Sequence, residues 1–416
     1  MKKKILISSG INNYHMLFTA SEINKRKKLS YLFCGPYPLK KYLIFLKKIN
    51  FLKPIKRLIN RKHNIKEIYI NDLWIPELLS QINVIIQKIL SIKFLNDKLD
   101  YLSFKLFQNL TLKFILKCNL NNVSVFHFRS GYGGKIINYL NKKKIITLCD
   151  HGIVHPKILD YLTENKGKFP LNKNFILKKN FWMLVNEDLE KSDYILANSN
   201  FVKKTLTYFG IPQNKIFVVY QGIENKFIKQ IPKIKSLKKK SKKIKVLFSG
   251  TLTLRKGILD IQKSLYYLKN SNIELHLAGN IAHRIKSALN TLLDNKKVIY
   301  HGLLDKKSLA HLMCNSDIFI FPSYAEGSAR VIFEAMVCGC VIITTKNSGS
   351  IVKNKINGTI IKPGKPNEIA NAIKYYVNKK KLIRKISINN KKLILRNFNQ
   401  KIYGDKLIKI YKKINA

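Results

Sequence analysis

Short apolar runs alternate with longer amphipathic stretches along most of this chain. In the first half, six runs have the length and composition of buried strands: 4–9, 31–34, 123–128, 144–149, 194–199 and 216–220. Stretches with helical periodicity follow several of these runs, beginning near residues 14 and 133 and filling 77–118. Strands that alternate with helices predict a parallel sheet covered by helices on both faces.

The second half repeats this alternation after a lysine-rich interruption. Its predicted strands are 245–249, 273–278, 298–301, 318–321 and 341–345, with helices from 257 and over the tail at 397–414. A chain of 416 residues is too long for one ordinary core. We therefore expect two doubly wound domains, 1–222 and 245–396, a linker at 223–244, and a helix at 397–416 that packs back on the first domain.

The charge of the chain is strongly positive, with 78 Lys and Arg against 23 Asp and Glu. Only nine of the basic residues are Arg, and the Lys residues are spread through every segment. Base readout favours Arg and clustered contacts, so we interpret the charge as a compositional bias and expect no nucleic-acid partner. An anionic membrane surface is the more plausible partner.

Residues 38–62 are rich in Lys, Leu, Ile, Phe and Tyr, which suits basic amphipathic helices lying on a membrane. A solvated helix pair packed on the sheet is the alternative. No apolar run is long enough to span a bilayer. The six cysteines have no CxxC or metal-ligand spacing, which is typical of reduced cytosolic thiols. We expect a cytoplasmic protein, peripheral at most on the inner face of the membrane.

Two glutamates stand out in this basic chain because acids are scarce. Glu326 falls in the loop after the predicted strand 318–321, and Glu334 about two turns into the following helix. Gly327 and Ser328 offer backbone N–H groups at the helix start, and a carboxylate beside them suits sugar hydroxyls. The alternative is one acid at a helix N-terminus and one on an exposed helix face.

A basic turn follows the first strand of the second half. Gly250 ends the strand, and Arg255, Lys256 and Gly257 open the next helix. Ligands of doubly wound sheets bind at the carboxyl ends of the strands. Glycines permit close approach, and cations at a helix N-terminus suit a diphosphate. A solvated basic turn is the alternative.

In the first domain, the segment 150–156 follows a predicted strand and is expected to face the cleft. His155 is the candidate there for contacting the transferred sugar or orienting an acceptor, with a structural histidine as the alternative; His151 is the weaker candidate. Gly10 ends the first strand and would let a donor phosphate approach. Arg129, also at a strand end, is a candidate acceptor ligand.

Residues 246–373 resemble the donor-binding domain of GT-B glycosyltransferases, in the retaining E-x7-E group (family 4 type, glycosyl transferases group 1). The matching segments are 249–257, 276–279, 300–302, 316–323, 326–334 and 358–361. The segment 193–223 also fits the end of that family's first domain. Two positions depart from the family pattern. Thr251 stands where many members have Arg, and Arg255 would take over the role of that Arg. Val341 stands where Pro is common.

The resemblance implies a GT-B fold, with two Rossmann-like domains facing across a cleft, and transfer of a sugar from a nucleotide diphosphate sugar with retention of configuration. Arg255 and Lys256 would hold the diphosphate, Glu326 the sugar and Glu334 the ribose. Further implied donor-site positions are Gly10, Gly250, Thr251, Gly327 and Ser328, with Leu303 and Leu304 at the base. The family needs no metal.

We therefore expect a glycosyltransferase of hexosyltransferase type that acts on a glycan or lipid-linked acceptor in surface polysaccharide or glycolipid synthesis. One alternative is a GT-B relative with phosphorylase-type chemistry, which would depend on free phosphate. Another is a basic membrane- or nucleic-acid-binding protein on an inactive scaffold. Intact acidic and basic site positions argue against the inactive scaffold.

Overall fold

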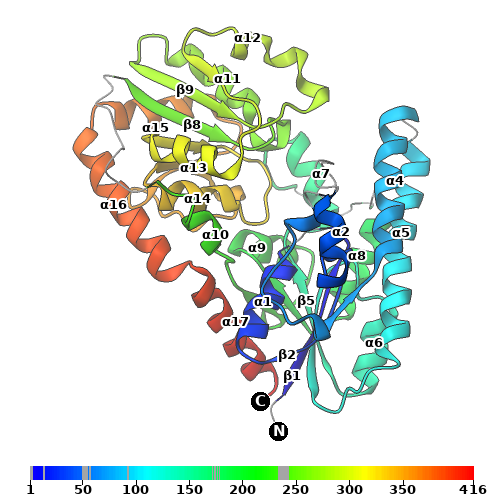
Figure 1. Cartoon of the computed structure of the whole chain (residues 1–416). Helices are drawn as coiled ribbons and strands as arrows, with labels where there is room; N and C mark the ends of the chain where they lie inside the picture. Colours follow the sequence, from blue (N-terminus) through cyan, green and yellow to red (C-terminus); the bar gives the residue numbers. More distant parts are fainter. Residues whose placement is uncertain are drawn as a thin grey trace.

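The computed structural model describes residues 3–12, 15–48, 55, 58–90, 93–170, 172, 175, 177, 179–232 and 243–416. It contains two parallel sheets, each with helices on both faces, and the two domains lie one above the other (Figure 1). The predicted doubly wound architecture is confirmed.

The first domain is built on a seven-stranded sheet with the order β3-β2-β1-β4-β5-β6-β7. Its strands are β1 (Lys4–Gly10), β2 (Leu29–Cys34), β3 (Ile70–Asp72), β4 (Val123–Arg129), β5 (Ile146–His151), β6 (Tyr194–Ala197) and β7 (Ile216–Val218). Its helices are α1 (Met16–Lys25), α2 (Lys40–Lys48), α4 (Trp74–Leu90), α5 (Lys93–Ile115), α6 (Lys135–Lys142), α7 (Pro156–Glu164), α8 (Asn180–Lys191) and α9 (Asn200–Tyr208).

The second domain has a six-stranded sheet with the order β10-β9-β8-β11-β12-β13. Its strands are β8 (Ile244–Ser249), β9 (Ile273–Ala278), β10 (Val298–Tyr300), β11 (Ile318–Phe321), β12 (Val341–Thr345) and β13 (Gly358–Ile361). Its helices are α10 (Asn225–Ile228), α11 (Ile258–Tyr267), α12 (Asn290–Leu293), α13 (Lys306–Cys314), α14 (Arg330–Val337), α15 (Pro366–Val377) and α16 (Lys380–Asn397), with a 3-10 turn η4 (Leu254–Lys256) before α11.

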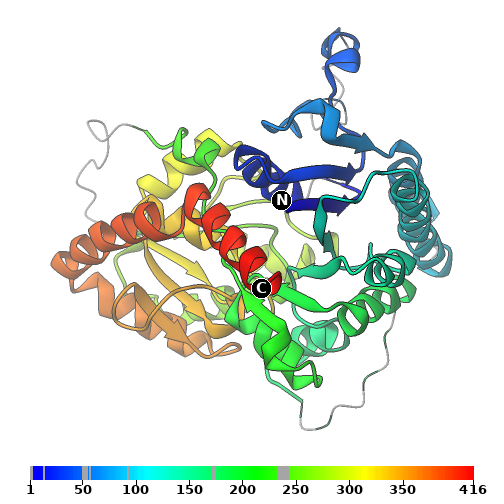
Figure 2. The same ribbon diagram turned by 90° about the horizontal axis from the view of Figure 1, so that it is seen from below.

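The last helix, α17 (Gln400–Ile414), returns to the first domain and packs beside α1 (Figures 1 and 2). The hydroxyl of Tyr403 lies 2.7 Å from Thr19 Oγ1, and the hydroxyl of Tyr411 lies 2.6 Å from His127 Nδ1. Arg26 on α1 forms a 2.7 Å ion pair with Asp405. These polar contacts, with apolar residues of both helices in one core, attach the end of the chain to the first domain.

Several sequence expectations need finer boundaries. The helical stretch 77–118 is two helices, α4 and α5, and the short strands β3 and β13 were not predicted as strands. Of the segment 38–62, residues 40–48 form α2, while 49–54 and 56–57 lie outside the described residues, as do 233–242 of the expected linker. None of the helices in the described ranges has the length and apolar character needed to cross a bilayer.

Candidate active site

The strand order places β8 directly beside β11 in the second sheet. The two strands run parallel, with Val246 opposite Ile318 and Leu247 opposite Phe319. The turns that follow Ser249 and Phe321 therefore leave the same edge of the sheet. This is the point where the strand order reverses, and ligands of doubly wound sheets bind there.

The backbone of the basic turn after β8 forms hydrogen bonds with the acidic loop after β11. Gly257 adopts the left-handed conformation, with φ 72°, and a Cβ there would lie 2.3 Å from the carbonyl oxygen of Pro322. The carbonyl oxygen of Arg255 accepts hydrogen bonds from the Tyr324 N–H at 2.8 Å and the Ser323 hydroxyl at 3.0 Å. Glycine at 257 thus permits the close packing of two turns that lie far apart in sequence.

The Arg255 side chain also contacts the loop after β11. Its Nη1 lies 2.7 Å from Glu326 Oε1 and donates to the carbonyl oxygen of Ala325. The Arg255–Glu326 contact is an ion pair without hydrogen-bond geometry, and both side chains are partly exposed. The two side chains keep some exposure at this edge, while the Glu326 Oε1 atom that faces Arg255 is itself buried.

Lys256 adds a second positive charge at this edge. Its Nζ lies 5.5 Å from the ring centroid of Phe321, and a Cβ on Gly250, whose φ is 138°, would lie 2.7 Å from that nitrogen. Burial lowers the pKa of Lys256, and the neighbouring charge of Glu326 opposes the shift. Glycine at 250 leaves the room that the Lys256 ammonium occupies, while Thr251 next to it is exposed.

Glu334 belongs to a different group of charges. Helix α14 begins at Arg330, so Glu334 lies about one turn into the helix and not the two turns expected from the sequence. Burial raises the pKa of its carboxyl, and the positive charges of Arg330 and Lys306 oppose this shift. Arg330 itself forms an ion pair with Glu224. The Glu334 carboxyl is thus buried near the charges of Arg330, Lys306 and Glu224.

Gly327 lies in the contact between the two domains. A Cβ at this position would lie 1.8 Å from the carbonyl oxygen of Gly152, and the Ser199 hydroxyl donates to the carbonyl oxygen of Gly327. Asn198 holds the opposing segment, because its Nδ2 donates to the Gly152 oxygen at 2.8 Å. The loop that carries Glu326 therefore touches the carboxyl end of the first sheet.

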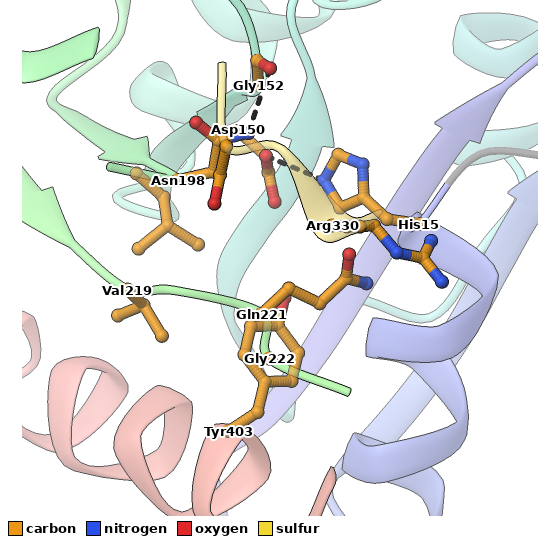
Figure 3. A pocket seen from close by; sticks show the side chains of 11 residues that line it. His15, Asp150, Gly152, Asn198, Val219, Gln221, Gly222, Arg330 and Tyr403 are labelled. Atoms are coloured by element: carbon orange, nitrogen blue, oxygen red, sulfur yellow. Dashed lines mark hydrogen bonds and ion pairs between the residues drawn. The ribbon is translucent and has the colours of Figure 1, made fainter. Parts of the chain in front are cut away.

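A pocket of about 260 Å³ opens between the domains beside this contact (Figure 3). Its lining comes from both domains and includes His15, Asp150, Asn198, Gln221, Ser328, Arg330 and Tyr403. The predicted Ser328 lies there together with side chains that the sequence analysis did not select. One feature of the sequence could have identified Arg330, since it is one of only nine Arg residues. No feature of the sequence marks His15 or Gln221, because their position at the pocket depends on the packing of the domains.

Asp150 is a buried carboxylate on the lining of this pocket. Its Oδ1 lies 2.8 Å from His15 Nε2, as Figure 3 shows, and its Oδ2 lies 3.3 Å from His127 Nε2. Although burial opposes ionisation, the two imidazoles hold the pKa of the Asp150 carboxyl well below its usual range. His15 is therefore held in place by a buried carboxylate on the lining of this pocket.

The structure places two of the predicted first-domain residues in packed surroundings. A Cβ on Gly10 would lie 2.3 Å from the ring of Tyr132, so glycine at this position accommodates an aromatic side chain. His155 is buried, stacks on Phe209 with centroids 4.4 Å apart, and caps α7 by accepting the Lys157 N–H at 3.2 Å. These contacts fit the structural alternative for His155.

The expected base-pocket residues have different surroundings. Leu304 packs against the core of the second domain and lines a pocket of about 730 Å³ together with His301 and Asp305. Leu303 is 73% exposed, so it does not line an enclosed pocket in this structure. Arg129 lines a further pocket in the first domain, of about 490 Å³.

Comparison with known proteins bears on the family and the fold of this chain. The family described as glycosyl transferases group 1 matches residues 229–393. An uncharacterized glycosyltransferase of Methanocaldococcus jannaschii is 28% identical over 282 residues, which cover 66% of this chain and 68% of the relative. The N,N'-diacetylbacillosaminyl-diphospho-undecaprenol alpha-1,3-N-acetylgalactosaminyltransferase of Campylobacter jejuni is 26% identical over 269 residues, covering 61% and 70%.

Among solved structures, HepE of Anabaena in complex with UDP and glucose covers 99% of this chain and 100% of its own, with a TM-score of 0.61 and 13% identity. That likeness shows the fold, and the sequence matches show the class of enzyme. The chain carries a glycosyl transferases group 1 domain on a GT-B fold, and it is a glycosyltransferase.

The buried position of His155 predicts a dependence of stability on pH. Burial, followed by the charges of His151 and Lys157, lowers the pKa of His155 to about 3. The unfolded chain therefore binds a proton at this residue that the folded chain excludes, and stability falls as the pH drops below about 6.5. Between pH 7 and pH 5, the wild type should lose about 2 kcal/mol of unfolding free energy through His155. The variant His155→Asn should lack this part of the loss.

Asn at this position keeps a helix-capping oxygen and does not titrate. Urea unfolding at the two pH values measures the effect. An unchanged loss of stability between them in His155→Asn would show that the imidazole is accessible to protons in the folded protein.

Proposed function

We propose that this glycosyltransferase moves a hexose from a nucleotide diphosphate sugar to a hydroxyl of a glycan or lipid-linked acceptor, with retention of the anomeric configuration. The observation that carries the proposal is the Arg255–Glu326 ion pair beside the Lys256 ammonium, at the adjoining ends of β8 and β11. Two cations next to a partly exposed carboxylate match a diphosphate joined to a sugar.

Each charged group has a role in this proposal. Arg255 and Lys256 bind the diphosphate through charge-assisted hydrogen bonds, which are stronger than hydrogen bonds between neutral groups. Glu326 leaves Arg255 and accepts hydrogen bonds from hydroxyls of the donor sugar. Glu334 accepts from the ribose, Gly250, Thr251 and Ser328 surround the phosphates and sugar, and Leu304 lies toward the base.

The chemical step breaks the bond between the anomeric carbon and the leaving phosphate oxygen. The acceptor hydroxyl oxygen forms the new bond to that carbon on the same face, and its proton passes to the departing phosphate. Positive charge develops on the sugar and negative charge on the phosphate. Arg255 and Lys256 stabilise the leaving group, and the rest of catalysis comes from holding the two reactants in contact.

The acceptor and cellular setting follow from the same proposal. The Campylobacter relative is named for transfer to a saccharide on diphospho-undecaprenol, which supports a lipid-linked acceptor here. We place the enzyme at the cytoplasmic face of the membrane, in the synthesis of a surface polysaccharide or glycolipid.

Replacing both cations tests the diphosphate assignment. Arg255→Ala with Lys256→Ala should weaken the affinity for a nucleoside diphosphate by about 100-fold, because two charged hydrogen-bond donors are lost. Isothermal titration calorimetry measures the dissociation constant. The matched control is Arg384→Ala with Lys385→Ala, an exposed Arg-Lys pair on α16. Equal affinity of the two double variants would refute the assignment.

Replacing the carboxylate tests the role of Glu326. Glu326→Ala should lower the rate of sugar transfer by about 10²- to 10³-fold, because the donor sugar is no longer held in the geometry of transfer. The rate is measured with a donor identified by screening nucleotide sugars for thermal protection. Circular dichroism confirms the fold. Transfer at the wild-type rate would remove Glu326 from the mechanism.

We also propose that no metal takes part in transfer, because Arg255 and Lys256 supply positive charge where the leaving phosphate lies. Transfer should therefore proceed at an unchanged rate in excess EDTA and should not rise when Mg²⁺ or Mn²⁺ is added. A loss of activity in EDTA that is restored by one of these ions would contradict this part of the proposal.

A further inference from the structure

Helix α4 presents apolar side chains to solvent along one face. Ile75, Leu78, Ile82 and Ile85 are 63%, 52%, 51% and 56% exposed. Their spacing of three and four residues places them in one stripe along the helix. A helix on the surface of a soluble domain normally shows polar residues on this side, so the stripe needs an explanation.

Two polar residues of α4, Glu77 and Asn83, are buried, while Gln81 is exposed. Glu77 is buried in an ion pair with Arg61 and accepts the Asn12 N–H at 2.7 Å. Asn83 is fully buried and donates through Nδ2 to Asp100 at 2.8 Å. Rolling the helix to bury its apolar stripe would break these buried contacts, at a large cost in stability. The outward stripe is therefore fixed by the fold.

Positive charge lies beside the stripe. Helix α2 meets α4 through Tyr42 and Trp74, whose ring centroids are 5.7 Å apart. Lys40 and Lys41 at the start of α2 are exposed, and so is Ile44 one turn further on. Among the described side chains of α4, residues 74–86, the single acid is the buried Glu77. The Glu67 carboxylate accepts the Lys40 N–H at 3.0 Å, and Asp72 accepts from Trp74 Nε1 at 2.7 Å, so two acids lie beside these lysines. The four residues of the stripe itself are all apolar.

We infer that this α2–α4 surface, formed by Lys40, Lys41, Ile44, Ile75, Leu78, Ile82 and Ile85, docks on an anionic lipid bilayer. The apolar side chains would enter the boundary between headgroups and acyl chains, and the lysines would contact anionic headgroups. A second copy of the chain fits less well, because pairing two such surfaces brings together proteins with a formal charge of +55 each.

The position of the surface suits this role. The α4–α5 pair stands at the edge of the first domain in both views (Figures 1 and 2). Its inner side lines the 490 Å³ pocket through Ser80, Asp100 and Phe104, and Gly152 lies on the lining of the same pocket. If the proposed transfer to a lipid-linked acceptor holds, docking brings the lipid surface to the helices that line this pocket.

Vesicle flotation tests the inference without requiring turnover, so it can fail independently of the proposed function. The full-length protein is mixed with vesicles of phosphatidylcholine and phosphatidylglycerol in equal amounts, or of phosphatidylcholine alone. The test variant is Leu78→Gln, Ile82→Gln, Ile85→Gln. The control is Ile356→Gln, Ile388→Gln, Leu395→Gln, which replaces three exposed apolar residues of the second domain.

We expect the wild type and the control to float with the anionic vesicles, and the test variant to lose about tenfold in its partition coefficient. Circular dichroism and nucleoside diphosphate affinity confirm that the variant is folded. No flotation of the wild type, or equal flotation of the test variant, would overturn the inference. A wild-type dimer in light scattering that the test variant abolishes would assign the surface to a second copy instead.

Discussion

The ion pair between Arg255 and Glu326 is the contact on which the account of the site depends. It exists because β8 and β11 are neighbours in the sheet although some 70 residues separate the two side chains. The backbone carbonyl of Arg255 accepts a hydrogen bond from the loop after β11, and Gly257 lets the two turns pack closely. The geometry thus sets a cation and a carboxylate at one ligand-binding edge before any donor is present.

The second constraint is the joining of the two domains. The loop after β11 touches the end of β5 through Gly327 and Gly152, and α17 returns from the second domain to pack on α1. These contacts set the charged edge of the second sheet against the first domain and leave the pocket that holds His15 and Asp150. A transferase that must bring a donor and an acceptor together needs such a junction.

The sequence predicted those parts of the fold that local pattern decides. The run 318–321 coincides with β11 because a buried central strand is continuously apolar, and the Gly-rich basic turn was located from residue types alone. Contacts between residues far apart in the sequence were missed. Gly10 accommodates Tyr132, and the Asp188 carboxylate accepts backbone N–H groups of Gly131 and Gly133 at 2.7 and 2.9 Å. Similarly, the membrane expectation for 38–62 did not include α4, whose exposed face depends on buried partners such as Arg61.

The central claim is that Glu326 binds the sugar while Arg255 and Lys256 bind the diphosphate. The most direct measurement compares the affinity of Glu326→Ala for the nucleotide sugar with its affinity for the matching nucleoside diphosphate. The account predicts a loss of about tenfold or more for the nucleotide sugar and none for the nucleoside diphosphate, since only the former offers hydroxyls to the carboxylate. An equal loss for both ligands would show that Glu326 acts only by positioning Arg255, and would contradict the account.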